Sequence, residues 1–329
     1  MSASLLDRAR AGDQAAFADL TARHVRELHL HCYRMLGSLT DADDALQETL
    51  FAAWSALPGF AGRSSLRAWL YRIATNRCLN AIRDGRRRPP AVPVPPFEPP
   101  PPSRRGDVTW LQPYPDAVAD REPGPAERYE TRERLELAFV TALQRLPPRQ
   151  TAVLVLCEVL DFPLAEAAGM LDATPAAAKG LLQRARASLD YEVGSPPPAR
   201  PASAVERELA GRFAAALSAD DVEGVLALLT DDAWLAMPPA PHEYVGAAAI
   251  ASFLRASAEG RAGRRLSLVP TRANGEPAFL CFVEAGAGEA VQPSGVVVLR
   301  LRGDRIGGIT RFLDPVLVSR FDLARRGRH

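Results

Sequence analysis

Polar residues of the types that bind nucleic acids recur in the segment SLRAWLYRIATNRCLNAIR, residues 65–83. Arg72, Asn76, Asn80 and Arg83 follow one another at about one helical turn, so a helix capped by Ser64 or Ser65 gathers them on one face. Arginine neutralises phosphates, and asparagine side chains donate to and accept from base edges. The pattern therefore favours a helix that lies on a nucleic-acid duplex.

A short loop precedes this helix and combines an aromatic ring with small polar residues. Phe60, Arg63, Ser64 and Ser65 all lie within it. Aromatic rings stack on unpaired bases, and small polar residues leave space for a base that has left the duplex. The loop is therefore a candidate site for a flipped base.

An acidic helix lies before the loop. Thr40 is its expected N-cap, and Asp41, Asp44 and Glu48 share one face at spacings of three and seven residues, opposite an apolar face. Acids in the first turn also suit the positive end of the helix dipole. By itself such a stripe is typical of a solvated helix face.

The segment from Asp161 to Leu189 has the layout of a helix-turn-helix. A short helix over Pro163–Leu171 is followed by a brief turn, and Thr174 with Pro175 supplies the N-cap and first position of a second helix. An ordinary helical hairpin is the alternative, but the second helix directs outward Lys179, Gln183, Arg184 and Arg186. This basic face favours a DNA-reading motif.

Proline-rich segments divide the 329-residue chain into three modules. Nine of the fourteen residues from Pro89 to Pro102 are proline, a composition typical of an extended spacer, and GSPPPARPAS marks a second break. The predicted order is a helical module at 1–88, a linker at 89–125, a second helical module at 126–192, a linker at 193–203 and a third module at 204–323.

The composition excludes some classes of protein. The four cysteines are scattered and lack CxxC spacing, so we expect no metal, no disulfide framework and no cofactor. The sequence contains no apolar run near the roughly 18 residues of a membrane span. A cytoplasmic protein is the expectation.

In order, the segments DADDALQETLFAAW, SLRAWLYRIATNRCLNAIR and LAEAAGMLDATPAAAKGLLQRARASL resemble the extracytoplasmic-function (ECF) sigma factors of bacterial RNA polymerase. The resemblance covers Leu5–Arg88 and Arg134–Tyr191. It implies that the helix containing Asp41–Trp54 docks on core RNA polymerase through Asp41, Asp44, Gln47 and Glu48.

The resemblance also implies how promoter DNA binds. The loop over 60–65 would trap a flipped base of the −10 element, Arg72, Asn76, Asn80 and Arg83 would touch the upstream edge of that element, and the helix from Thr174 would enter the −35 major groove. This chain departs from the family pattern at Asp172, which replaces a usual glycine. Because Ala176, Ala177 and Gly180 offer few hydrogen-bonding groups, we expect −35 recognition to rest on backbone contacts and DNA shape.

The third module changes from helical period to strand alternation, which predicts an α+β domain. The expected helices are 206–217, 222–229 and 247–258, and the expected strands are 233–237, 266–273, 277–284, 295–301 and 306–313. LLTDDAWLAMPPAPHEYVGAAAIASFL resembles the SnoaL-like branch of the nuclear-transport-factor-2-like fold, a cone that closes over a pocket. WLQPYPD in the linker and GITRFLDPVLVSRF near the end resemble sigma factors that carry this domain.

Possible pocket residues of the third module are Trp234, His242, Tyr244, Arg272, Asn274 and Arg311. Met237 is expected in the core, and His242 is expected in a surface loop. No catalytic residue is assigned. The preferred hypothesis is a sigma factor regulated by contact of this domain with the sigma modules, and the alternatives are a DNA-binding regulator fused to an isomerase-like or hydrolase-like enzyme and a plain helix-turn-helix repressor.

Overall fold

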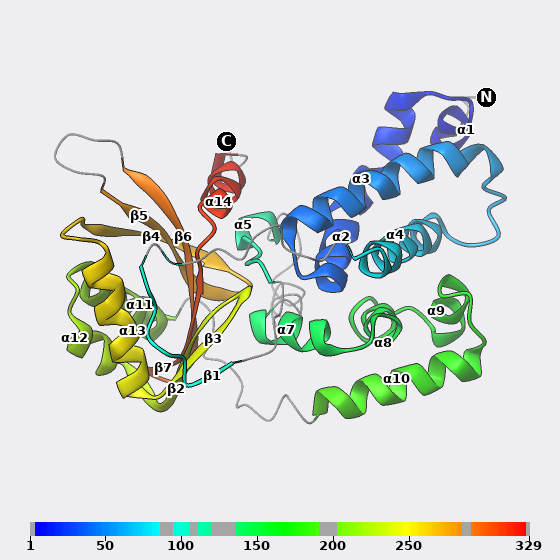
Figure 1. Cartoon of the computed structure of the whole chain (residues 1–329). Helices are drawn as coiled ribbons and strands as arrows, with labels where there is room; N and C mark the ends of the chain where they lie inside the picture. Colours follow the sequence, from blue (N-terminus) through cyan, green and yellow to red (C-terminus); the bar gives the residue numbers. More distant parts are fainter. Residues whose placement is uncertain are drawn as a thin grey trace. The chain divides into compact units, whose positions relative to one another are not determined.

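The computed structural model describes residues 4–85, 95, 97–105, 111–119, 136–190, 203–284 and 291–326. The chain divides into two compact units, Met1–Arg88 with Ala138–Gly194, and Pro89–Leu137 with Ser195–His329 (Figure 1). Parts of both predicted linkers, Trp110 and the start of the predicted second module lie outside the described residues.

The first unit contains α1 (Leu5–Arg10), α2 (Gln14–Leu36), α3 (Leu39–Ala56), the 3-10 turn Leu57–Gly59 and α4 (Leu66–Arg83). The prediction that Thr40 caps the acidic helix is wrong. Ser38 is the N-cap, since its hydroxyl accepts a hydrogen bond from the Asp41 amide at 3.1 Å. Gly37, at φ 72°, ends α2 immediately before it, so α3 begins two residues earlier than expected.

The rest of the first unit contains α7 (Leu137–Arg145), α8 (Pro148–Leu154), a π-helical turn (Val155–Val159), α9 (Leu164–Met170) and α10 (Pro175–Asp190). The helix-turn-helix layout is as predicted, and Thr174 Oγ1 accepts the Ala177 amide at 3.2 Å. Asp172 has φ 48° and forms the turn where the family usually has glycine, a conformation that aspartate tolerates.

The described parts of the two helical regions pack together within the first unit. The ring of Tyr71 on α4 is fully buried and lies between His31 and Phe162, with ring centroids 5.2 Å from each. Phe162 follows the π-helical turn. The aromatic contact of Tyr71 with Phe162 thus joins α4 to the segment that begins the helix-turn-helix.

The second unit is built on a mixed sheet in the order β1-β3-β2-β7-β6-β5-β4, in which only β2 and β7 pair in parallel. Its strands are β1 (Arg104–Arg105), β2 (Leu229–Met237), β3 (Ala240–Val245), β4 (Leu266–Ala273), β5 (Glu276–Val283), β6 (Gln292–Arg302) and β7 (Arg305–Phe312). Its helices are α5 (Asp116–Ala119), α11 (Ala204–Ser218), α12 (Val222–Leu226), α13 (Ala247–Gly260) and α14 (Val316–Arg326).

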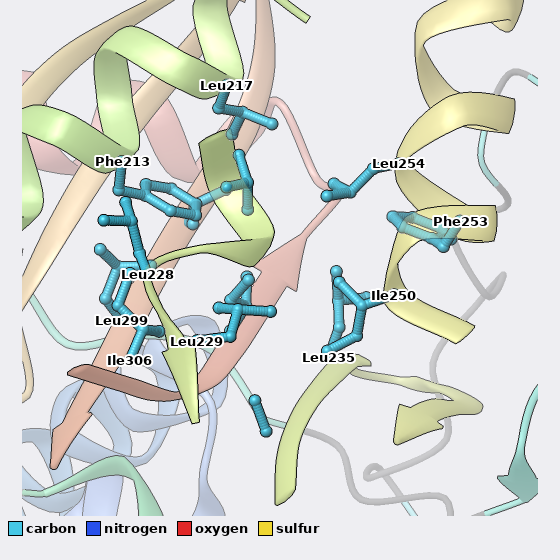
Figure 2. Packing of buried hydrophobic residues seen from close by; sticks show 14 of the residues in the cluster. Phe213, Leu217, Leu228, Leu229, Leu235, Ile250, Phe253, Leu254, Leu299 and Ile306 are labelled. Atoms are coloured by element: carbon cyan, nitrogen blue, oxygen red, sulfur yellow. The ribbon is translucent and has the colours of Figure 1, made fainter. Parts of the chain in front are cut away.

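The core of this unit forms where α11, α12 and α13 pack on one face of the sheet (Figure 2). Phe213 and Leu217 come from α11, Phe253 comes from α13, and Leu299 comes from β6. Alternating burial along β2 places Met237 in this core, as expected.

Two predictions for this domain are wrong, and one helix was missed. The second helix ends at Leu226, because the chain has already entered β2 at Leu229. The segment predicted as a loop around His242 is strand β3, since it pairs with β2 on one side and with β1 on the other. Helix α14 was not predicted.

Candidate polymerase and nucleic-acid interface

The structure brings the predicted polymerase-binding acids together. Asp41, Asp44 and Glu48 line one shallow groove between α3 and α4, and Arg77 of α4 lies at the same groove. Gln47 is exposed on the same helix. The arrangement presents carboxylates at the rim of a concave surface, which suits a basic partner.

The sequence reasoning missed Phe51, which is 72% exposed. Phe51 lies three and seven residues after Glu48 and Asp44, so its ring shares their face of α3. A largely exposed phenyl ring beside carboxylates is typical of a protein interface, in which an aromatic anchor is surrounded by polar groups. The helical spacing of Phe51 from the acids was the signal that could have identified it.

The candidate −10 loop is held by the start of α4. Ser65 is the N-cap, accepting the Ala68 amide at 3.1 Å, and Arg63 and Ser64 are exposed. The ring of Phe60 differs from expectation, because it is buried and packs on Trp69 with centroids 4.9 Å apart. In this arrangement Phe60 supports the loop and does not offer its ring to a base.

The predicted row on α4 is largely at the surface. Arg72, Asn80 and Arg83 are exposed and Asn76 is half-buried. Arg72 Nη2 donates to Asp172 Oδ1 of the helix-turn-helix turn at 2.7 Å. Arg72 therefore has to leave this carboxylate before it can contact a phosphate.

The neighbouring Arg67 strengthens the same contact between α4 and the helix-turn-helix. Its guanidinium lies over the ring of Phe162, 4.4 Å from the centroid, and donates to the carbonyl of Leu160 at 3.3 Å. A cation over an aromatic face is attracted by the ring quadrupole. Two arginines of α4 thus bind the segment that surrounds α9.

The predicted −35 helix has the expected orientation. Ala178, Leu182 and Ala185 are buried on the inner side of α10, while the basic and amide residues face outward: Lys179, Gln183, Arg184 and Arg186 are all exposed. Arg186 donates to Glu158. The exposed stripe is continuous over two turns.

The linker after the first helical module is seated on the second unit. Strand β1 pairs with β3, and Arg104 donates to both carboxylate oxygens of Glu243, at 2.7 and 2.6 Å. Tyr244 Oη donates to the carbonyl of Pro100 at 2.8 Å, and Phe97 packs on Phe253. The sequence predicted an extended spacer, and here residues 97–105 form part of a domain.

A second set of bonds holds the WLQPYPD segment. The Tyr114 amide donates to Asn274 Oδ1 at 2.7 Å, and the Asn274 amide donates to the Tyr114 carbonyl at 2.9 Å. Asp116 accepts from the Gly275 amide at 2.8 Å and from Arg272 Nε at 3.3 Å. We call these contacts of Tyr114 and Asp116 with Arg272, Asn274 and Gly275 the linker seat. Because Tyr114 and Asn274 are fully buried, the linker seat is part of the packed interior.

The six possible pocket residues therefore do not lie together in one site. Tyr244, Arg272 and Asn274 bind the linker, and Trp234 lies against Gly308, where an added β-carbon would come within 2.5 Å of the indole. His242 lies on β3, beside β1. Arg311 lines a cavity in the domain.

A buried carboxyl group lies next to the linker seat. Glu276 is 8% exposed, and burial raises its pKa to about 8. Attraction to Arg300 and Arg272 opposes the rise, while repulsion from Glu136 and Asp116 adds to it. At neutral pH this carboxyl group keeps its proton in the folded unit.

Glu276→Gln is expected to remove a pH dependence of stability. The unfolded carboxyl titrates near its ordinary 4.5, so between about pH 4.5 and 8 the folded state binds a proton that the unfolded state lacks. Stability of the second unit should therefore fall as pH rises through this window, by about 1.4 kcal/mol per unit at most. Hydrogen exchange of β4–β7 at pH 5.5 and 7.5 measures this change, with Glu259→Gln as the exposed control. If Glu276→Gln keeps the pH dependence of the parent protein, the raised pKa does not belong to Glu276.

No helix among the described residues is long and apolar enough to cross a membrane. In the same part of the chain, no group of three or more histidine, cysteine or acidic residues is placed to hold a metal ion.

Three family models match separate parts of the chain. Sigma-70 region 2 matches residues 20–88, Sigma-70 region 4 matches 136–189, and the SnoaL-like domain matches 210–308. The ECF RNA polymerase sigma factor SigG of Mycobacterium tuberculosis is 41% identical over 319 residues, 95% of this chain and 85% of SigG. SigM of the same species is 35% identical over 193 residues, 59% of this chain and 85% of SigM.

A solved structure has a similar fold over most of the chain. The crystal structure of the M. tuberculosis extracytoplasmic function sigma factor SigJ aligns with a TM-score of 0.60 at 20% identity, covering 92% of this chain and 98% of SigJ. The fold class, two all-α sigma modules followed by an α+β SnoaL-like domain, is confirmed.

These helices and this sheet define a sigma-70-type subunit with a fused SnoaL-like domain. The chain belongs to the ECF RNA polymerase sigma factors. It directs promoter recognition and transcription initiation, its partners are core RNA polymerase and promoter DNA, and it is not an enzyme.

Proposed function

We propose that separate surfaces of the first unit bind core polymerase and promoter DNA during initiation. Residues of α3 (Asp41, Asp44, Gln47, Glu48 and Phe51) bind core polymerase, the loop with α4 binds the −10 element, and α10 binds the −35 element. The observation that carries this proposal is the difference between these helices: α3 contains no lysine or arginine and presents an acidic and aromatic face, whereas the outward faces of α4 and α10 carry exposed arginines. Since polymerase and promoter are cytoplasmic, we place the protein in the cytoplasm.

Asp44→Arg is expected to lower the affinity for core polymerase about tenfold, because it reverses an exposed charge at the rim of the docking groove. Binding to labelled core enzyme at low and moderate salt measures the loss, which should shrink as salt rises. Asp19→Arg on α2 makes the same charge change on an exposed acid away from the groove. Equal effects of the two variants would contradict the location of the docking face.

Arg83→Ala is expected to weaken promoter binding by the holoenzyme while core affinity stays unchanged. Arg83 is exposed at the end of α4, and loss of one phosphate contact should reduce the salt slope of promoter binding by about one. Promoter binding at several salt concentrations measures this, with Arg8→Ala as a control on α1. Loss of core binding would show that the DNA-binding role proposed for α4 is wrong.

We also propose that the SnoaL-like domain regulates the sigma modules through the linker. Region 2 and region 4 are joined by the linker whose residues 97–105 and 111–116 bind the second unit. A linker held in this way limits the separations available to the two regions, and the fused domain has a high effective concentration for its own linker.

Truncation tests the regulatory proposal. Chains that end near Ser195 or near Arg320 are compared with the full-length protein in transcription by reconstituted polymerase. The shorter chain lacks the linker seat, so its promoter output should differ from that of the full chain. Identical output from all three proteins would remove the regulatory role without affecting the promoter-binding assignments.

A further inference from the structure

One segment of the linker, residues 97–105, lies along an edge of the sheet in the second unit, and we call it the strap. Its last two residues form β1, which pairs antiparallel with β3 at the end of the sheet (Figure 1). The strap sequence, FEPPPPSRR, contains four successive prolines, which favour an extended polyproline conformation and have no backbone amides to donate. The strap is therefore held through side chains, a carbonyl group and its two strand residues.

The first contact of the strap is aromatic. Phe97 packs against the core of the unit, and its ring centroid lies 5.8 Å from that of Phe253 on α13. Gly260 is the last residue of α13, and an added β-carbon at this position would overlap the side chain of Phe97. The ring of Phe97 therefore fits here because residue 260 has no side chain.

The middle of the strap is bound by Tyr244. This residue is fully buried, its ring centroid lies 4.9 Å from that of Phe253, and its hydroxyl group donates to the Pro100 carbonyl at 2.8 Å. Aromatic side chains line the grooves in which several kinds of domain bind polyproline segments. This edge of the second unit therefore has the chemistry of a polyproline-binding groove.

The last contact of the strap is charged. Arg104 donates to both carboxylate oxygens of Glu243, and the Val245 amide donates to Ser103 Oγ at 3.0 Å. The side chain of Glu243 is only 18% exposed beneath the strap, whereas that of Arg104 is 65% exposed. A segment without the arginine would leave this carboxylate largely buried and without its bidentate partner, so the groove favours arginine at this position.

The strap lies on the outside of the unit. Its residues 98, 101 and 103–105 are exposed, and β1 is only two residues long. The linker seat differs in this respect, because Tyr114 is fully buried in the interior. The strap can therefore leave the edge of the sheet, and another segment can take its place, while the linker seat and the sheet stay intact.

We propose that this edge of the second unit is a peptide-binding site and that the strap is its resident ligand. The class of ligand is a proline-rich segment with a phenylalanine three residues before the proline that binds Tyr244 and an arginine four residues after that proline. Such a segment of another protein has to displace the strap, whose tether gives it an effective concentration on the order of millimolar. The strap thus excludes weak ligands from the site.

A synthetic peptide of residues 95–106 is the probe, and fluorescence anisotropy measures its binding to the full-length protein. The peptide should bind a chain carrying Phe97→Ala and Arg104→Ala at least about tenfold more tightly than the parent chain, in which the strap competes. In the peptide itself, Phe97→Ala or Arg104→Glu should weaken binding to this variant chain about tenfold or more. Glu98→Arg in the peptide is the control at an exposed position and should change binding by less than about twofold.

Gly260→Ala tests the groove from the side of the protein. The added methyl group should displace the ring of Phe97 and raise the exchange rate of the Val245 amide, which bonds to the strap, about tenfold or more. Gly211→Ala is the matched control, because Gly211 lies in helix α11 and an added β-carbon there meets no atom of the described residues within 4 Å, its own helix apart. Alanine is a better helix former than glycine, so neither helix is weakened by the substitution itself.

Three results would each overturn the proposal: no saturable binding of the peptide to the variant chain, equal binding of the peptide with Phe97→Ala, or equal Val245 exchange in Gly260→Ala and Gly211→Ala. If Gly260→Ala lowers the melting temperature, the peptide substitutions decide the question, since they leave the protein unchanged. All of these measurements report binding or amide exchange. The peptide site can therefore fail or hold independently of the proposed regulation of initiation.

Discussion

Phe51→Ala is expected to weaken the binding of core RNA polymerase about thirtyfold, the cost of roughly 2 kcal/mol that defines an interface anchor. The ring is 72% exposed in the free chain, so its removal takes little from the packing of α3. Its neighbours on the exposed face are Asp44, Gln47 and Glu48, which suit the polar surroundings of such an anchor. Equilibrium binding of core enzyme to the labelled sigma factor measures the change.

Leu5→Ala provides the matched control, because Leu5 is an exposed apolar side chain on α1, 37% exposed and outside the α3 face. It should leave core affinity within about twofold of the parent protein, as most surface substitutions do. Phe51→Leu separates aromatic from merely apolar character and should retain part of the affinity. If Phe51→Ala and Leu5→Ala behave alike, the exposed ring is not a polymerase contact.

The helical modules were predictable because local rules determine most of their elements. Ser65 and Thr174 cap the helices that the sequence assigned to them, and the inward and outward residues of α10 follow helical period. The N-cap of α3 was placed wrongly at Thr40. Gly37 is the C-cap of α2 and Ser38 is the N-cap of α3, so one helix ends and the next begins at adjacent residues. Here the choice depends on where the preceding helix ends.

Contacts between residues distant in the sequence could not be predicted in this way. Phe60 looks like an open loop residue in the sequence, but Trp69 and the preceding helices bury its ring. Strand β3 was missed because a proline-rich stretch with little alternation becomes a strand only through its pairing with β2 and β1. The same is true of Arg272 and Asn274, whose partners lie about 160 residues earlier in the chain.

Asp116→Ala is expected to release the linker from the SnoaL-like domain. Asp116 accepts from the Gly275 amide and from Arg272, and hydrogen bonds to a charged group contribute about 1.5–3 kcal/mol each. Removing both should raise the exchange rates of the Tyr114 and Asn274 amides roughly thirtyfold or more. Arg272 still pairs with Glu206 in the variant, so no buried cation is left without a partner and the domain should remain folded.

The transcriptional effect of Asp116→Ala follows from the proposed role of the seat. A free linker allows region 2 and region 4 more separations, so promoter output with reconstituted polymerase should rise above that of the parent chain. Asp304→Ala, an exposed acid in the β6–β7 turn, should change neither amide exchange nor output. Faster exchange with unaltered output would mean that the seat stabilises the domain but does not regulate initiation, whereas unaltered exchange would show that Asp116 does not hold the linker.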